Sequence, residues 1–344
     1  MQALPKITVG KQPDSAPPEH TEQKKLSIVP PRVSGKSEGR FADTAFSSLV
    51  IGCAVSLLVI VALIVMELVR QSSLSRHQFK LSFISTSVWN PVSGEFGALP
   101  FIFGTIVSSL LGLLIAVPLS MGTALFLTEL CPPFLRRILG TTVELLAAIP
   151  SVIYGLWGIF VLAPFLRVYV EPWLSKHFGW TGLFSGPPYG IGMLAAGIIL
   201  AIMILPIVAS ITREVILAVP RQQREAVLAL GATRWEVLRM GVLRNARVGI
   251  VGAIILGLGR AIGETMAVTM VIGNRPEIAK SLFAPGYTLA SVIANEFSEA
   301  TDDLYLSSLI EIALVLFVIT LIVNALARLL VWSVTRGTPS RTLA

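Results

Sequence analysis

Residues 189–212 read YGIGMLAAGIILAIMILPIVASIT, a run without a single charged side chain. A helix needs about 20 such residues to cross the roughly 30 Å hydrocarbon core of a membrane. Backbone N–H and C=O groups find no water in that core, so the chain must satisfy them within a helix or a closed barrel. The strand-like alternation of a membrane barrel is missing from the sequence. This stretch therefore predicts an all-α membrane protein.

Five more apolar runs of similar length lie before and after this one. The predicted spans are 47–69, 101–127, 145–166, 189–212, 248–273 and 304–332. Internal prolines (Pro118, Pro206) and recurrent glycines allow the second, fourth and fifth spans to be tilted or broken. The pattern predicts six transmembrane helices.

Composition agrees with a membrane protein. Of the 344 residues, 54% are hydrophobic and 14% are charged, whereas roughly 25% are charged in soluble domains. The formal net charge of +7 comes from basic residues that lie mostly between apolar runs, which is typical of membrane orientation and gives no reason to expect nucleic acid. The distant Cys53 and Cys131, and three scattered histidines, predict no disulfide framework, no metal site and no cofactor.

The basic residues also predict an orientation. With the N-terminus inside, 19 lysines and arginines fall on the inner side, 7 on the outer side, and Arg260 within a span. The positive-inside rule then places both termini in the cytoplasm. Trp89, Trp173 and Trp180 fall in outer loops or near span ends, as interfacial anchors do.

Two tails flank the membrane domain. Residues 1–44 are rich in proline and poor in large apolar residues, which predicts a disordered cytoplasmic tail. Residues 45–333 form the predicted membrane domain, and 334–344 a second cytoplasmic tail. Gly35-Lys36-Ser37 looks like the end of a phosphate-binding P-loop, but Pro30 stands where the first glycine is required. We therefore do not expect this chain to hydrolyse ATP.

The inner loop at about 213–247 carries local structure signals. Its sequence RQQREAVLAL after Pro220 favours a helix, and Gly231 suits a left-handed turn at its end. Thr233 can cap a second helix, with Glu236 completing a capping box. The pattern predicts helix, glycine turn, helix on the cytoplasmic face; a solvated basic linker is the simpler alternative.

The fifth span reads GLGRAIGETMAV from Gly257 to Val268. Arg260 and Glu264 are four residues apart and would face the same side of a helix. A charge at a helix centre is costly, so it normally faces a cavity or a partner. Arg260 presents a planar donor fork that matches tetrahedral oxyanions. Glu264 would orient Arg260 or, if protonated, donate to the anion; alternatively the two charges only neutralise each other.

The same span carries a close-contact motif, and the third span carries a proline. Gly259 and Gly263 form a GxxxG ridge that lets another helix approach closely. Pro150 cannot donate to the Leu146 carbonyl, which predicts an unpaired acceptor facing a cavity, with the Ser151 and Tyr154 hydroxyls nearby. A simple packing kink is the alternative. Glu311, in the last span, is left without an assigned role.

The inner loop resembles the EAA loop of ABC importer permeases. Glu225-Ala226-Val227 followed by Gly231 carries the resemblance, with valine in place of the usual second alanine and Leu243-Arg244 where the family often has Leu-Pro. In that family the loop docks on a separate ATPase subunit. The resemblance therefore implies an ATPase-docking role for Glu225, Ala226 and Gly231.

Three further stretches resemble the PstC-type permeases of bacterial phosphate importers. They are LLAAIPSVIYGLWG (145–158), GRAIGETMAV with the following IGN (259–274), and FLTELCP (126–132). With the EAA loop, the resemblance covers roughly residues 45–333. It implies the six-helix fold of type I ABC importer permeases and a location in the bacterial inner membrane.

The resemblance also implies a function and partners. The chain would be a non-enzymatic permease subunit that imports inorganic phosphate, with Arg260, Glu264, Thr265, Ser151 and Tyr154 along the path. Its partners would be a homologous second permease, two ATPase subunits, an extracytoplasmic phosphate-binding protein and membrane lipid. Rivals are an ABC permease for sulfate or molybdate, a proton-coupled secondary transporter in which Glu264 carries the proton, and a membrane scaffold.

Overall fold

A computed structural model describes the backbone of residues 38–335 and the side chains of residues 43–332. Of the predicted tails 1–44 and 334–344, residues 1–37 and 336–344, including the sequence resembling a P-loop, lie outside the described residues. Residues 38–44 and 334–335 are helical, because the first and last helices extend beyond the predicted membrane domain. Contacts divide the chain into two units, residues 1–59 and 60–344, and the first helix runs across the division.

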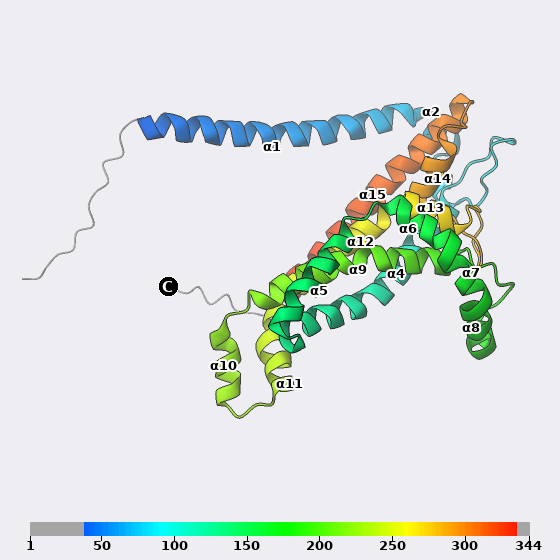
Figure 1. Cartoon of the computed structure of the whole chain (residues 1–344). Coiled ribbons are helices and arrows are strands. Elements are labelled where there is room, and N and C mark those ends of the chain that lie inside the picture. The colour runs from blue at the N-terminus through cyan, green and yellow to red at the C-terminus, as the bar shows by residue number, and fades with distance from the viewer. Residues whose placement is uncertain (1–37, 336–344) are drawn as a thin grey trace, which may run out of the picture. The chain divides into compact units, whose positions relative to one another are not determined.

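Helices make up the regular structure of the described residues, with one isolated bridge between Asn90 and Glu95 (Figure 1). In chain order they are α1 (Glu38–Gln71), α2 (Ser73–Phe79), α3 (Ser82–Ser85), α4 (Leu99–Leu125), η1 (Phe126–Leu130), α5 (Pro133–Ala147), α6 (Ser151–Trp157), η2 (Gly158–Leu162), α7 (Ala163–Phe165), η3 (Leu166–Val170), α8 (Glu171–Phe178), η4 (Gly179–Thr181), α9 (Met193–Leu217), α10 (Arg221–Ala229), α11 (Arg234–Glu236), η5 (Val237–Leu243), α12 (Arg244–Ile262), α13 (Met266–Ile272), α14 (Leu289–Glu296) and α15 (Asp303–Thr335).

Six helical stretches within the described residues are long and apolar enough to cross a membrane. They are Asp43–Gln71, Leu99–Leu130, Ser151–Thr181, Met193–Leu217, Arg234–Ile262 and Asp303–Trp332. The all-α class and the number of spans predicted from the sequence are confirmed.

Two spans differ from the prediction at both ends: the third is Ser151–Thr181 rather than 145–166, and the fifth is Arg234–Ile262 rather than 248–273. The third span begins at Ser151 rather than near 145, because the chain leaves α5 at Ala147 and Pro150 starts a new helix. The fifth span ends at Ile262 rather than 273, because the helix stops before Glu264. The prolines of the second and fourth spans, by contrast, lie inside continuous helices. Proline content alone did not locate the breaks.

Helix α9 forms the centre of the unit 60–344. Its Ile199, Ile204 and Val208 are almost completely buried, and it packs against α4 along much of its length, and against α12 and α13. Two thirds of its most apolar window is buried inside the chain. The stretch that predicts the fold class is therefore also the main core element.

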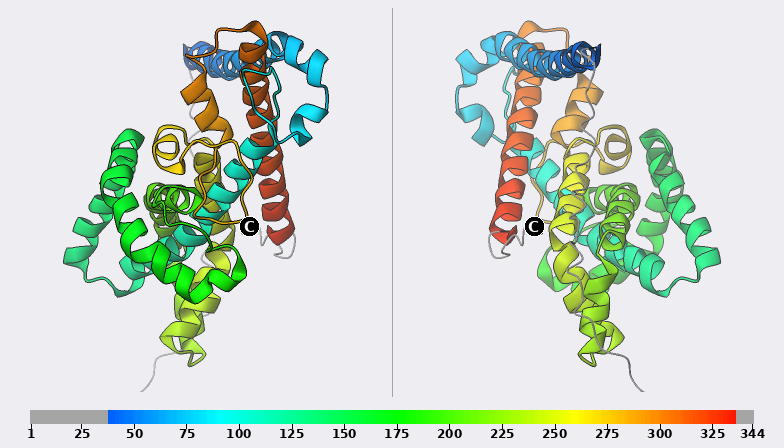
Figure 2. Two further views of the ribbon diagram at one scale, coloured as in Figure 1. Left: turned by 90° about the vertical axis from the view of Figure 1, so that its right-hand side faces the viewer. Right: turned by 90° about the vertical axis from the view of Figure 1, so that its left-hand side faces the viewer.

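A second core gathers aromatic side chains near the start of α15. Trp89 lies edge-on to Phe96 and Phe101, with ring centroids 4.8 and 4.9 Å apart. The Trp89 indole and the Tyr305 hydroxyl both donate to one carboxylate oxygen of Glu296, over 2.8 and 2.7 Å. Trp89 is therefore a buried core residue, and its prediction as an interfacial anchor is wrong. Figure 2 shows α14 beside the start of α15 at this end.

Candidate functional site

The break at the end of the fifth span is the first candidate site. Gly263, Glu264 and Thr265 separate α12 from α13. The Glu264 Oε1 accepts the backbone N–H of Ala267 over 3.4 Å, and the Thr265 hydroxyl donates to the Gly263 carbonyl over 3.4 Å. Side chains thus satisfy backbone groups that an unbroken helix would have paired internally.

Arg260 and Glu264 meet at this break. Nη2 of Arg260 lies 3.9 Å from Oε2 of Glu264, which is an ion pair but too long for a hydrogen bond. The Glu264 side chain is 7% exposed, whereas that of Arg260 is 42% exposed. The expectation that both residues lie on one continuous helix is wrong, because α12 ends at Ile262. The carboxylate is held in the protein, and the guanidinium remains open to its surroundings.

The third span packs beside the break. A Cβ on Gly155 of α6 would lie 3.2 Å from the Ala267 Cα and 2.5 Å from the Met270 sulfur, so α6 and α13 need glycine for this close approach. Ser151 and Tyr154 lie on the same short helix, half-buried and buried. The structure thus brings the helix of Ser151 and Tyr154 against the helix that follows the break.

The predicted open carbonyl at Leu146 is not open. The Tyr154 hydroxyl donates to the Leu146 oxygen over 2.8 Å, across the kink before Pro150. The Ile149 N–H also donates to this carbonyl, over 3.4 Å, so two donors replace the one that Pro150 lacks. The prediction of an unpaired acceptor facing a cavity is therefore wrong, and the Tyr154 hydroxyl is already engaged in the kink.

The two glycines of the fifth span have little around them within the described chain. A Cβ on Gly259 would meet nothing within 4 Å, and one on Gly263 only the Gly259 carbonyl, at 3.6 Å. Because α12 ends between them, they do not form a ridge on one continuous helix. Gly263 instead lies at the helix end, and the space beside both glycines is open.

The inner loop forms the second candidate site, a helical hairpin of α10, a glycine turn and α11 with η5 (Figure 1). Gly231 has φ of +80°, the left-handed conformation that favours glycine. The Glu236 carboxylate accepts the Thr233 N–H over 2.8 Å, and the Thr233 hydroxyl accepts the Glu236 N–H over 3.4 Å. The predicted turn and the predicted capping box are both confirmed.

An ion pair fixes this hairpin to the end of the second span. Arg224 of α10 donates to Glu129 of η1 over 2.7 Å, and its second nitrogen donates to the Ile216 carbonyl of α9 over 3.1 Å. Both charged side chains are about a quarter exposed. Sequence reasoning missed this pair, because 95 positions separate the two residues; the only signal was the charge of Glu129 in FLTELCP.

The surface of the hairpin is exposed and partly apolar. Glu225, Ala226 and Gly231 are all exposed. Leu230 is 87% and Trp235 62% exposed. Grouped apolar side chains on a surface mark a contact with another molecule. The residues predicted to dock a partner therefore lie on an accessible, partly apolar surface.

Six candidate spans, a charged break at the end of one of them and an exposed hairpin after the fourth fit a membrane permease. The family model described as binding-protein-dependent transport system inner membrane component matches residues 116–336. The chain belongs to this family of inner-membrane transport components.

The sequences of two relatives match this chain over most of its length. It is 51% identical over 295 residues to the phosphate transport system permease protein PstC of Mesorhizobium japonicum, covering 84% of this chain and 90% of that protein. It is 51% identical over 260 residues to PstC of Xylella fastidiosa, covering 74% and 80%. A chain of the inward-facing MetNI methionine ABC transporter is 20% identical with a TM-score of 0.49, covering 70% of this chain and 94% of that one.

Proposed function

We propose that this chain is the permease subunit of an ATP-driven importer of inorganic phosphate and forms the translocation path with a second permease. The relatives named as phosphate permeases support the substrate, since they match over most of the chain. The observation that supports a translocation path here is the exposed guanidinium of Arg260, which lies beside the break between α12 and α13. The termini lie in the cytoplasm.

Within the path, Arg260 is the group that meets phosphate. Its planar fork offers parallel N–H donors to two oxygens of a tetrahedral anion. Glu264 sits 3.9 Å away and balances the charge of Arg260 while the path is empty. Thr265 supplies a hydroxyl at the break, and Ser151 supplies one on α6, which packs against α13. Tyr154 acts by holding the kink before Pro150.

The partners follow from the two surfaces. Glu225, Ala226 and Gly231 dock one of two ATPase subunits, which hydrolyse ATP outside this chain. The open space at Gly259 and Gly263 receives a helix of the second permease. An extracytoplasmic phosphate-binding protein delivers the substrate to the outer loops.

The test is labelled-phosphate uptake into vesicles that hold this chain with its candidate partners, with ATP and a proton gradient supplied separately. Uptake driven by ATP, and competed by phosphate but not by sulfate or molybdate, is expected. Uptake driven by the proton gradient without ATP would replace the proposal with a secondary transporter. Equal competition by sulfate would support an ATP-driven importer but contradict phosphate as its specific substrate.

A Glu264→Gln variant tests the role of the carboxylate in the same assay. If Glu264 only balances Arg260, the variant retains uptake, since removal of a negative charge does not weaken anion binding. Loss of uptake with normal assembly would show that the ionised carboxylate takes part in the transport cycle.

A further inference from the structure

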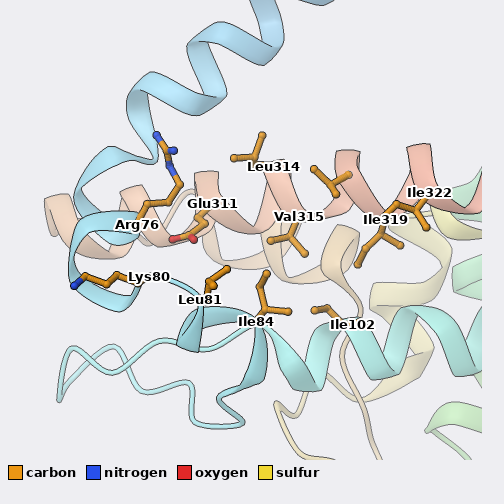
Figure 3. A pocket seen from close by; sticks show the side chains of 11 residues that line it. Arg76, Lys80, Leu81, Ile84, Ile102, Glu311, Leu314, Val315, Ile319 and Ile322 are labelled. Atoms are coloured by element: carbon orange, nitrogen blue, oxygen red, sulfur yellow. The ribbon is translucent and has the colours of Figure 1, made fainter.

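An apolar groove of about 560 Å³ lies between α15 and the segment from α2 to the start of α4. Aliphatic side chains line both of its sides, as Figure 3 shows: Leu314, Val315, Val318, Ile319 and Ile322 on α15, and Leu81, Ile84 and Ile102 opposite. Val318 is 44% and Leu81 82% exposed, so the groove is open. It contains none of the residues assigned to the path or to the hairpin.

One end of the groove is charged. Arg76 and Lys80 lie there, together with Glu311 of α15. Figure 3 shows the Glu311 carboxylate directed from α15 toward the segment that carries Lys80 and Leu81. Glu311 is only 5% exposed, so this carboxylate is nearly enclosed at the polar end.

One oxygen of the Glu311 carboxylate lacks a hydrogen-bond partner among the described residues. Its Oε2 is buried without a hydrogen bond within the described chain, and Glu311 takes part in none of the ion pairs found there. The neighbouring Ser75 hydroxyl accepts a bond from Ser308 over 3.1 Å and hydrogen-bonds the Glu311 side chain, which leaves Oε2 as the unpaired oxygen. Arg76 donates to the Ser72 hydroxyl over 3.0 Å and to the Val69 carbonyl. A buried acceptor of this kind indicates a donor that comes from outside the chain.

The length of the groove matches one leaflet of a membrane. Eleven residues separate Glu311 from Ile322 on α15, which is about 16 Å of helix. Half of a hydrocarbon core of roughly 30 Å is about 15 Å. The groove is therefore about as long as one leaflet is deep, which suits an acyl chain that lies along α15.

We propose that this groove binds phosphatidylethanolamine, with an acyl chain along α15 and the headgroup at the charged end. The lipid phosphate lies by Lys80 and Arg76, and the primary ammonium donates to Oε2 of Glu311. The charges select this headgroup: phosphatidylcholine has no N–H to donate, and phosphatidylglycerol has no positive charge for the carboxylate. The proposal does not depend on which solute the protein transports.

The test uses vesicles that contain the full assembled complex and phosphatidylethanolamine with a photoreactive acyl chain. Mass spectrometry is expected to place the label on residues 311–322 or 81–102. Unlabelled phosphatidylethanolamine is expected to compete about tenfold better than phosphatidylcholine, because a hydrogen bond to a charged group is lost with the latter. Phosphatidylglycerol is expected to compete as poorly.

Variants separate the headgroup contact from the groove. Glu311→Gln is expected to reduce the headgroup preference to about twofold or less, since its charge is gone. Val318→Trp is expected to reduce labelling by all lipids, because the indole fills the groove. Lys176→Gln, an exposed cation outside the groove, is the matched control and is expected to change nothing. If the complex does not assemble with Glu311→Gln, Lys80→Gln is used in its place, because Lys80 is exposed. It is expected to reduce labelling by phosphatidylethanolamine severalfold.

Three outcomes would overturn the proposal. They are equal competition by the three lipids in the unaltered protein, a preference that survives Glu311→Gln and Lys80→Gln, and a cysteine at position 318 that cross-links to a helix of the second permease in place of lipid label.

Discussion

The hairpin at Gly231 and the break at Glu264 are both interruptions of helix, but they arise differently. At the hairpin, Gly231 adopts a positive φ and Thr233 with Glu236 forms a capping box within six residues. At the break, Glu264 turns inward to cap α13 while Arg260 stays exposed on α12. The first is encoded by local residues, and the second depends on what surrounds the span.

The comparison also separates two kinds of charge. Arg224 is paired with Glu129 at 2.7 Å, a hydrogen-bonded contact that fixes one element to another. Arg260 is paired with Glu264 at 3.9 Å and keeps much of its surface open. A tight pair positions the chain, whereas a loose pair leaves a cation available to a ligand.

The largest effect is expected at Arg260. Arg260→Gln removes the one basic residue that lies within a span predicted from the sequence, and it is expected to abolish phosphate uptake. Membrane insertion is expected to be no worse, since a charge that costs roughly 2.5–3.5 kcal/mol at a helix centre is gone. Arg260→Lys should keep at most part of the uptake, because an ammonium lacks the planar fork. The measurement is labelled-phosphate uptake per assembled complex.

Arg275→Gln, an exposed arginine beyond α13, is the matched control and should transport normally. Normal uptake by Arg260→Gln would mean that Arg260 and Glu264 only neutralise each other.

The next effect is expected at the hairpin turn. Gly231→Leu forces a β-carbon into a left-handed conformation at a cost of about 1–3 kcal/mol, and it should separate ATP hydrolysis from uptake. Gly231→Asn should be tolerated better, since asparagine accepts this conformation. Substrate-stimulated ATPase activity, measured beside uptake, reports the coupling.

Gly182 supplies a matched control for that turn. It has φ of +75° and, like Gly231, open space around its β-carbon position, but it lies between the third and fourth spans. Gly182→Leu therefore carries similar strain away from the hairpin and should leave coupling intact. Equal loss of coupling in both variants would assign the effect to general instability.

A smaller effect is expected at the pair that fixes the hairpin. Arg224→Glu places two carboxylates together and should reduce coupled uptake severalfold, because α10 loses its contact with η1. The exchange Glu129→Arg with Arg224→Glu restores opposite charges and should recover part of the uptake. A double variant no better than Arg224→Glu would show that the pair does not position the hairpin.

The smallest effect is expected at the kink before Pro150. Tyr154→Phe removes the side-chain donor to the Leu146 carbonyl, which keeps its longer bond from the Ile149 N–H, and should cost about 1 kcal/mol of stability. A small fall in the melting temperature of the complex, with uptake reduced less than for Arg260→Lys, is the expected result. Collapse of uptake without a stability change would give the hydroxyl a direct role in the path.

The sequence by itself determined six spans, from six apolar runs, and a helical hairpin, from the capping box at Thr233 and the turn at Gly231. These features were readable because they depend on apolar length and on hydrogen bonds between near neighbours. Tertiary structure decided the rest: the inward turn of Glu264, the Tyr154 bond to Leu146, the burial of Trp89 and the pairing of Arg224 with Glu129. Each of these features depends on contacts between different helices or loops. The neighbouring residues that stabilise it come together only when the helices pack.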